Sequence, residues 1–200
     1  MLSRYPSEGK TTVVSNLALA LAEINRRVLI IDADLRRPWL HQIFDVANSW
    51  GLSDLLRERN PIANCPLEAV ARQTDIPGLY LLPSGPGTHS VSTLLHSPRT
   101  KDLLQRVRKE FDTVLIDTPP VMQISDARVL GQWAEGVVLV VRAGHTTRDA
   151  AKAATERFLE DGTRVLGTVL NGWDPKTSGY SYFDDSYYDQ VYPDTEKVKV

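Results

Sequence analysis

Short, uninterrupted apolar runs constrain the fold of this chain more than any other feature. A run such as Val28-Leu29-Ile30-Ile31 is expected of a β-strand buried on both faces, because a half-exposed strand alternates apolar and polar residues. The expected strands are residues 28–31, 79–82, 113–117, 136–141 and 164–170. Segments with helical spacing separate them, at residues 12–24, 51–57, 97–111, 125–133 and 147–160. Strands that alternate with helices predict an α/β fold with a doubly wound, mostly parallel sheet.

Length and composition limit the class of protein. The 200 residues suffice for one domain, and 42% hydrophobic and 24% charged residues are ordinary for a globular protein. A formal net charge of −2 gives no reason to expect a nucleic-acid partner. The single cysteine, Cys65, excludes an internal disulfide. No apolar stretch reaches the roughly 20 residues of a membrane helix, and no signal-peptide pattern is present, so we expect a cytoplasmic chain.

The first chemical motif is the second half of a Walker A sequence, Gly9-Lys10-Thr11. Gly9 lets backbone N–H groups approach phosphates, Lys10 would neutralise the β and γ oxygens, and the Thr11 hydroxyl would bind Mg²⁺. The helix that begins here would point its positive end at the anion. Arg4 stands where the first glycine of the motif belongs, and the alternative is a helix N-terminus with an exposed lysine. The expected nucleotide-binding residues of this loop are Ser7, Glu8, Gly9, Lys10, Thr11 and Thr12.

The strand that normally precedes a Walker A loop is not evident. Such a loop follows a buried strand, yet only Met1 and Leu2 come before the motif. We expect either that the chain is a trimmed version of a longer protein or that its start is placed too late. In both cases a central strand would be missing, which would leave unpaired backbone groups on its neighbours.

Two carboxylates follow the first expected strand, in Ile31-Asp32-Ala33-Asp34. The carboxyl end of a parallel strand is where doubly wound sheets bind ligands. Two aspartates so close repel each other unless a proton or a cation lies between them, and Mg²⁺ satisfies this requirement. The alternative is that both aspartates merely cap the next helix.

A third motif, Val114-Leu115-Ile116-Asp117, is an apolar strand that ends in aspartate. This is the Walker B layout, in which Asp117 holds Mg²⁺ directly or through water. Many strands end in aspartate, so the motif is weak when taken alone. The order Walker A, Asp-x-Asp, Walker B predicts an Mg-ATP site in a P-loop nucleotide-binding fold.

The three motifs resemble those of bacterial protein-tyrosine kinases. The matching strings are Glu-Gly-Lys-Thr-Thr, Ile-Asp-Ala-Asp-Leu-Arg-Arg-Pro and Leu-Ile-Asp-Thr-Pro-Pro, and the likeness covers nearly the whole chain. These proteins are cytoplasmic P-loop autokinases associated with the polysaccharide co-polymerases of capsule and exopolysaccharide export. The MinD/ParA-like ATPases share Walker A and B more broadly, and the Asp-x-Asp string separates the two families best.

The resemblance implies roles for individual residues. Asp32 would activate the tyrosine hydroxyl, directly or through the metal. Asp34 and Asp117 would hold Mg²⁺ with Thr11, so that the expected catalytic residues are Lys10, Asp32, Asp34 and Asp117. Asn171, after the last strand, resembles a position near the adenine. The implied cofactors are ATP and Mg²⁺.

The C-terminal segment differs in kind from the rest of the chain. We expect a P-loop kinase domain over residues 1–172 and a flexible, tyrosine-rich tail over residues 173–200. In the family such tails are phosphorylated between subunits, which makes the expected phosphoacceptors Tyr180, Tyr182, Tyr187, Tyr188 and Tyr192. Each phosphate adds nearly two negative charges and would loosen an assembly. The alternative is an aromatic interaction motif.

Together these features predict an ATP-dependent protein-tyrosine autokinase that regulates polysaccharide polymerisation and export. The resemblance implies a partner, the cytoplasmic segment of a transmembrane co-polymerase, and a homo-oligomer formed through the tyrosine tail. The chain would then be peripheral to the inner membrane. The alternative function is a MinD/ParA-type nucleotide-switched ATPase without kinase activity. A further possibility is an impaired chain that keeps the motifs without efficient catalysis.

Overall fold

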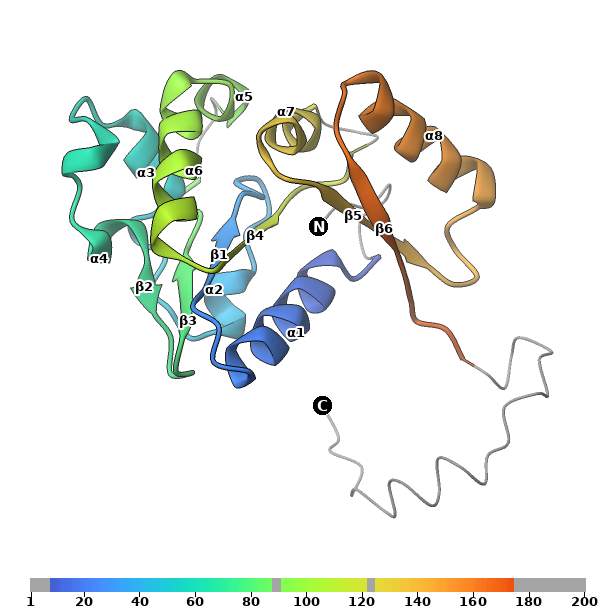
Figure 1. The fold of residues 1–200 in the computed structure, drawn as a ribbon, viewed down its shortest axis with the longest axis horizontal. Helices are drawn as coiled ribbons and strands as arrows, with labels where there is room; N and C mark the ends of the chain where they lie inside the picture. The colour runs from blue at the N-terminus through green and yellow to red at the C-terminus, as the bar shows by residue number, and fades with distance from the viewer. Residues whose placement is uncertain (1–7, 88–90, 122–124, 175–200) are drawn as a thin grey trace, which may run out of the picture.

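A computed structural model describes residues 8–87, 91–121 and 125–174 of the chain (Figure 1). Its strands form a four-stranded group in the order β2-β3-β1-β4 and a two-stranded group, β5-β6. All pairs are parallel except β2 with β3. In chain order the strands are β1 (Val28–Asp32), β2 (Arg72–Gln73), β3 (Leu79–Leu82), β4 (Thr113–Asp117), β5 (Val137–Arg142) and β6 (Val165–Asn171). The mostly parallel α/β fold predicted from the sequence is therefore confirmed.

The five helices expected from the sequence are present, each with ends within two residues of the prediction. They are α1 (Lys10–Glu23), α3 (Leu52–Arg57), α6 (Pro98–Glu110), α7 (Asp126–Trp133) and α8 (Arg148–Glu160). The structure adds shorter elements, namely α2 (Leu40–Ile43), the 3₁₀ helix η1 (Ile62–Asn64), α4 (Leu67–Val70) and α5 (Val91–Leu95). Within the described ranges, every helix is too short or too polar to cross a lipid bilayer.

Strand β1 is the centre of the larger sheet, and all five of its residues are buried. Because side chains alternate across a strand, its residues serve two cores. Leu29 and Ile31 pack into a cluster with residues of α3, α5 and α6, whereas Val28 and Ile30 join a cluster with residues of α1. The sheet is therefore covered by helices on both faces, as Figure 1 shows with α1 on one side and α3, α5 and α6 on the other.

The smaller sheet has its own core. Val137 and Leu139 of β5 pack with Ala127 of α7 and with Ala154 and Phe158 of α8. In Figure 1, α8 lies against the outer side of β5 and β6. This cluster makes β5, β6, α7 and α8 a second packed unit beside the four-stranded sheet.

Across the described ranges, the two sheets do not join through a ladder of hydrogen bonds. In the part of the chain that the structure describes, no strand pairs with the second edge of β4 or with the second edge of β5. The expected burial of residues 28–31 on both faces is confirmed for β1, whereas residues 113–116 of β4 are half-buried. The physical reason is that, within the described residues, β4 has a neighbouring strand on its β1 side only.

Candidate nucleotide-binding site

The predicted motifs converge at the carboxyl ends of the strands. Asp32 and Asp117 end β1 and β4 and are register partners across the parallel pair. Asn171 ends β6, beside Arg142 at the end of β5. The loop before α1 contacts Asn171 through Glu8, and Thr11 in the first turn of α1 contacts Asp117. The site therefore lies where α/β sheets bind ligands.

Gly9 is the N-cap of α1, and its backbone has a conformation that suits glycine. Its φ is 86°, in the left-handed region that other L-residues rarely adopt. A Cβ atom at this position would lie 1.9 Å from Nδ2 of Asn171. Both the backbone angle and the close side chain therefore require glycine, and helix α1 begins at the next residue with its amides toward the loop.

Glu8 is held to the β5-β6 sheet by its carbonyl and its carboxylate. Asn171 Nδ2 donates to the Glu8 carbonyl oxygen at 2.9 Å, and Thr146 Oγ1 donates to Glu8 Oε1 at 2.5 Å. The Arg142 amide in turn donates to Thr146 Oγ1 at 3.0 Å. Glu8 is fully buried. These bonds connect the start of the loop to the carboxyl ends of β5 and β6.

Lys10 is buried in the same region, with 8% of its surface exposed. Burial lowers the pKa of its ammonium group, and the charges of Asp117, Glu8 and Asp34 act in the opposite direction. The neighbouring carboxylates favour the charged form of Lys10, and a charged lysine at this position neutralises phosphate oxygens in Walker A loops.

Thr11 and Asp117 are in direct contact. Thr11 Oγ1 donates to Asp117 Oδ2 at 2.6 Å, across 106 positions of sequence. Asp117 is 3% exposed, and burial raises its pKa, while the Thr11 hydroxyl and Lys10 lower it. The Walker A hydroxyl and the Walker B carboxylate therefore meet, as the motifs predicted.

Asp32 is fully buried at the end of β1. Its Oδ2 accepts hydrogen bonds from the amides of Trp39 and Leu40, both at 3.2 Å. Burial raises the pKa of Asp32 to about 7, the nearby charge of Asp117 adds to this, and the two amides oppose it. A carboxyl group in this environment can hold or release a proton near neutral pH.

Asp34 is half-buried in the loop that follows β1. Its Oδ1 accepts from the amides of Arg36 and Arg37 at 3.3 and 3.1 Å. Burial raises the pKa of Asp34, and these amides lower it. The two bonds fold the chain back after β1, which orients Asp34 beside the ends of β1 and β4.

The carboxylates suit a hard divalent cation. Asp32 Oδ1 and Asp117 Oδ1 are buried and accept no hydrogen bond from any described residue. Among residues with described positions, no three His, Cys, Asp or Glu side chains gather into a complete metal site. Mg²⁺ does not require one, because it is usually held by one or two carboxylates together with water and substrate phosphates. Oxygen donors with unused capacity beside a phosphate loop fit that preference.

The remaining predicted site residues make other contacts or fall outside the described residues. Thr12 is exposed on α1, where its carbonyl accepts from Asn16 Nδ2 at 3.0 Å. Asn171 contacts the loop entrance, and its place beside an adenine stays a prediction. Ser7 and the five tail tyrosines, Tyr180, Tyr182, Tyr187, Tyr188 and Tyr192, lie outside the described residues.

The structure also adds residues that the sequence analysis did not select. Thr146 and the amides of Trp39 and Leu40 contact motif carboxylates. Asp126 is fully buried and accepts from Arg36 Nη2 and Ser92 Oγ, both at 3.0 Å. This network ties the Asp34 loop to α7. The only available signals were a threonine and an aspartate near the expected helix starts.

A phosphate-type loop, a buried lysine and carboxylates at and just after two strand ends define a P-loop nucleotide-binding protein. A family model described as an AAA domain matches residues 7–157. The cell division ATPase MinD of Pyrococcus furiosus has a similar solved structure, with a TM-score of 0.67 and 25% identity, covering 84% of this chain and 69% of that chain. These findings confirm the predicted P-loop fold class.

More specific matches identify the family. The tyrosine-protein kinase YwqD of Bacillus subtilis (strain 168) is 35% identical over 182 residues, covering 90% of this chain and 75% of that protein. The solved kinase domain of the Escherichia coli tyrosine kinase ETK has a TM-score of 0.80 and 34% identity, covering 90% of this chain and 70% of that chain. The chain belongs to the bacterial tyrosine-protein kinase family. It spans about a quarter of the length of the longer curated relatives Ptk and Wzc.

Proposed function

We propose that this chain is an ATP-dependent protein-tyrosine kinase that phosphorylates its own C-terminal tyrosines. One observation carries the proposal: the register of β1 with β4 places the buried Asp32 beside Asp117, which Thr11 contacts from the phosphate loop. Phosphoryl transfer requires positioning and charge neutralisation more than covalent chemistry. This set of residues can supply both.

The phosphates would lie against the amides at the start of α1. Lys10 would neutralise the β and γ oxygens, and Gly9 gives the backbone the close approach that this requires. Thr11, Asp34 and Asp117 would hold Mg²⁺, which supplies charge neutralisation at the transferred group when it is bound. Asn171 fixes the loop through Glu8, so an adenine contact would come in addition to that role.

Asp32 would act on the acceptor hydroxyl. Its Oδ2 is occupied by two backbone amides, so Oδ1 is the atom that could accept the phenol proton. Because Asp32 is fully buried, direct transfer requires the loop of residues 33–39 to move aside. In the other route Asp32 acts through the cation.

The acceptors in this proposal are Tyr180, Tyr182, Tyr187, Tyr188 and Tyr192. Asp184, Asp185 and Asp189 surround them, so each added phosphate increases repulsion within an already acidic segment. Modification between subunits of a homo-oligomer would then weaken the assembly and regulate polysaccharide polymerisation and export. The partner would be the cytoplasmic segment of a transmembrane co-polymerase, which would hold the chain at the inner membrane.

A phosphotyrosine map tests the proposal. The intact chain is incubated with Mg-ATP, with and without the cytoplasmic segment of a family co-polymerase, and modified tyrosines are identified by mass spectrometry. We expect phosphate on the tail tyrosines and none in Lys10→Met. Lys152→Met is the matched control, because Lys152 is exposed on α8 and its ion pair among the described residues is with Glu156 at 3.7 Å, so its map should equal the wild-type map. An unmodified tail in the wild-type chain, with both Mg-ATP and the co-polymerase segment present, would refute kinase activity.

The second candidate is a nucleotide-switched ATPase of the MinD type, which the similarity to the MinD structure supports. The MinD structure is 25% identical in sequence to this chain, against 34% for the ETK kinase domain. ATP hydrolysis with nucleotide-dependent dimers and unmodified tyrosines would favour the ATPase.

A further inference from the structure

A polar cluster beside the nucleotide site is formed by Arg36, Ser92 and Asp126. Arg36 Nη2 donates to Asp126 Oδ2 at 3.0 Å and to Ser92 Oγ at 3.4 Å. The Ser92 hydroxyl donates to Asp126 Oδ1 at 3.0 Å. Both carboxylate oxygens of Asp126 therefore have a donor, and the three side chains form a closed set of hydrogen bonds.

The three side chains come from segments that follow three neighbouring strands. Arg36 lies in the loop after β1, Ser92 lies in α5, the first described helix after β3, and Asp126 begins α7, the first described helix after β4. Strands β3, β1 and β4 are adjacent and parallel, so these segments meet at the carboxyl edge of the sheet. The cluster therefore links the surroundings of the site across three strands.

The two charges of the cluster differ in burial. Asp126 is fully buried, whereas the Arg36 side chain is 37% exposed. A buried carboxylate without a partner is strongly unfavourable, because it has lost its water and gained no compensating charge. Asp126 therefore favours the arrangement in which the Arg36 guanidinium stays against it, and the pair restrains Arg36 more than an exposed ion pair would.

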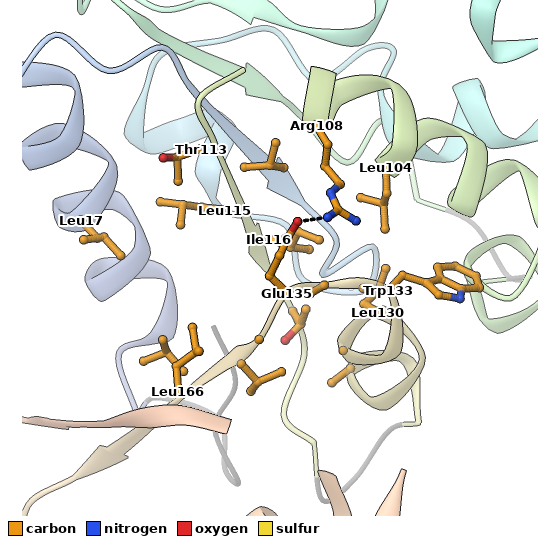
Figure 2. A pocket seen from close by; sticks show the side chains of 18 residues that line it. Leu17, Leu104, Arg108, Thr113, Leu115, Ile116, Leu130, Trp133, Glu135 and Leu166 are labelled. Atoms are coloured by element: carbon orange, nitrogen blue, oxygen red, sulfur yellow. Dashed lines mark ion pairs between the residues drawn. The ribbon is translucent and has the colours of Figure 1, made fainter. Parts of the chain in front are cut away.

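The packing of α7 makes this anchor important for the helix. Leu130 and Trp133 of α7 line an apolar cavity of about 260 Å³, shown in Figure 2. Side chains beside a cavity have fewer neighbours that fix their position. The ion pair of Arg108 with Glu135, also drawn in Figure 2, lies beyond the other end of α7, and both of its side chains are exposed. Of these two ion pairs, the buried one is therefore the stronger anchor.

The backbone of Arg36 extends the restraint to Asp34. The amides of Arg36 and Arg37 donate to Asp34 Oδ1 at 3.3 and 3.1 Å. Since Arg36 is two residues from Asp34, holding its side chain against α7 also holds these amides in place. Asp34 lies in a loop, whereas Asp32 and Asp117 are strand residues that the sheet fixes. Asp34 is therefore the carboxylate of the site that depends most on contacts outside the sheet.

We propose that Arg36 and Asp126 are positioning residues for the divalent cation, which hold the Asp34 carboxylate in the place from which it binds the metal. This inference rests on the cation role proposed for Asp34 above. Ligating carboxylates depend on hydrogen-bond partners of this kind, and loss of such a partner typically reduces metal affinity by about 10- to 100-fold. Nucleotide binding without metal uses the phosphate loop and does not require the cluster.

Mn²⁺ provides the test, because it accepts the same oxygen ligands as Mg²⁺ and is paramagnetic. Its Kd is measured by electron paramagnetic resonance on the full-length chain with ADP, after correction for Mn²⁺ bound by free ADP, and the Kd of ADP is measured without metal. Arg36→Gln should raise the Kd of Mn²⁺ at least about tenfold and change the Kd of metal-free ADP less than about twofold. Equal losses in both affinities would show that the cluster supports the whole pocket, and the proposal would be wrong.

Two further variants separate positioning from a failure to fold. Asp126→Asn removes the charge and keeps the shape of the side chain, so it should weaken Mn²⁺ binding as much as Arg36→Gln does. The double variant leaves no buried charge unpaired, and it should bind Mn²⁺ no more weakly than either single variant, since both changes remove one interaction. Losses that multiply in the double variant would mean that the two residues act independently, which would overturn the proposal.

The ion pair of Arg128 with Asp161 is the matched control. Arg128 also belongs to α7, and its guanidinium donates to both carboxylate oxygens of Asp161 at 2.5 Å. This pair joins α7 to the C-cap of α8 instead of to the Asp34 loop. Arg128→Gln should therefore leave the Kd of Mn²⁺ unchanged. A loss of Mn²⁺ affinity equal to that of Arg36→Gln would refute a specific role of the cluster.

Phosphotyrosine, measured on the same chains, separates this inference from the proposed function. Cluster-dependent Mn²⁺ binding without phosphotyrosine in the wild-type chain would reject the kinase function and support the positioning role. A phosphorylated wild-type chain, with unchanged Mn²⁺ affinity in Arg36→Gln, would support the kinase and overturn the positioning role. A wild-type chain that binds no Mn²⁺ beside ADP would overturn both.

Discussion

Two structural constraints apply to Gly9, namely a positive φ and the close approach of the Asn171 side chain. We expect Gly9→Ala to reduce nucleotide affinity by at least roughly tenfold, because the added Cβ displaces the Asn171 amide and deforms the phosphate loop. Isothermal titration with Mg-ATP would measure the change. The strain of the left-handed conformation adds about 1–2 kcal/mol to the loss of folding stability.

Gly144 provides the matched control for Gly9. It has a φ of 69°, but a Cβ there would have no heavy atom within 4 Å. Gly144→Ala should therefore lose stability through strain and keep its nucleotide affinity. Shortening Asn171 to alanine in the Gly9→Ala chain should restore part of the affinity, since the two changes are coupled. Similar affinities for the two glycine variants would contradict the role of the close approach.

Asp32 links the site to the pH dependence of stability. Its folded pKa of about 7 exceeds the ordinary value of 3.8, so ionisation disfavours the folded state. This cost is absent below pH 4, develops between pH 4 and 7, and is complete above pH 7. Asp32→Asn should therefore raise the free energy of unfolding by about 1–3 kcal/mol at pH 8 without Mg²⁺, and by far less at pH 4.5.

Urea unfolding of both chains at the two pH values would measure this difference. Asp75→Asn is the control, because Asp75 is exposed and far in sequence from the motifs. A stability gain of equal size at pH 4.5 and pH 8 would show that the asparagine acts by packing rather than by removing a charge.

At the residue scale, the chemical roles of side chains are predicted from the sequence better than their contacts in space. The roles of Gly9, Thr11 and Asp117 follow from motif spacing, and the Thr11–Asp117 contact agrees with them. The Thr146–Glu8 bond joins residues 138 positions apart, and no local pattern encodes such a pair. The same limit applies to Asp126, whose partner Arg36 comes from a distant loop.

Helix α8 illustrates what capping contributes to one element. Thr147 is its N-cap, and the Thr147 side chain accepts from the Ala150 amide at 3.2 Å. Thr147→Ala should reduce the free energy of unfolding by about 1 kcal/mol, because the amide loses its partner. Chemical denaturation followed by circular dichroism would measure the loss.

Thr155 in the same helix is the comparison residue. Its hydroxyl donates to the Ala151 carbonyl at 3.0 Å, a bond that competes with regular helix geometry. Thr155→Ala should leave stability unchanged or raise it by about 0.5 kcal/mol, since alanine has the higher helix propensity. A loss as large as that of Thr147→Ala would mean that α8 is stabilised by packing of both threonines rather than by its cap.

The long helices and buried strands were predictable because periodicity and apolar runs act within a short window. The short elements were not. Helices α2 and α4 have four residues each, too few to show a period. Strand β2 has two residues, and the Arg72 guanidinium at its start donates to the Ala47 and Trp50 carbonyls at 2.6 and 3.0 Å. Tertiary contacts of this kind define these elements, and sequence patterns do not report them.

At the scale of the whole molecule, the parallel sheet followed from the alternation of strands and helices, whereas strand order did not. Hydrophobic runs indicate that strands are buried, but they do not indicate which strands are neighbours in the sheet. Among the described residues, β4 and β5 each have one edge without a strand partner. Which strands carry such an edge became clear only from the structure.

The phosphate loop connects the two sheets, and this predicts how nucleotide affects the whole molecule. Glu8 contacts Asn171 and Thr146 of the smaller unit, while α1, which follows the loop, packs against β1 and β3. A ligand held by this loop opposes any opening that separates the units. At about 100 times its Kd, Mg-ATP should slow amide exchange in β6 by up to roughly 100-fold where exchange requires release of the ligand.

Asparagine variants distinguish this coupling from general stabilisation. Asn171→Ala removes the bond to Glu8, so the nucleotide-dependent protection of β6 should fall to less than about tenfold, while the nucleotide-dependent protection of β1 persists. Asn16→Ala removes an exposed amide on α1 that donates to the Thr12 carbonyl of the same helix, and should keep the full effect. Exchange must be compared at equal nucleotide saturation, since Asn171→Ala can also weaken binding. If saturating Mg-ATP left amide exchange in β6 unchanged in the wild-type chain, the nucleotide would stabilise only the sheet of β1 and β4. The phosphate loop would then not couple the two sheets.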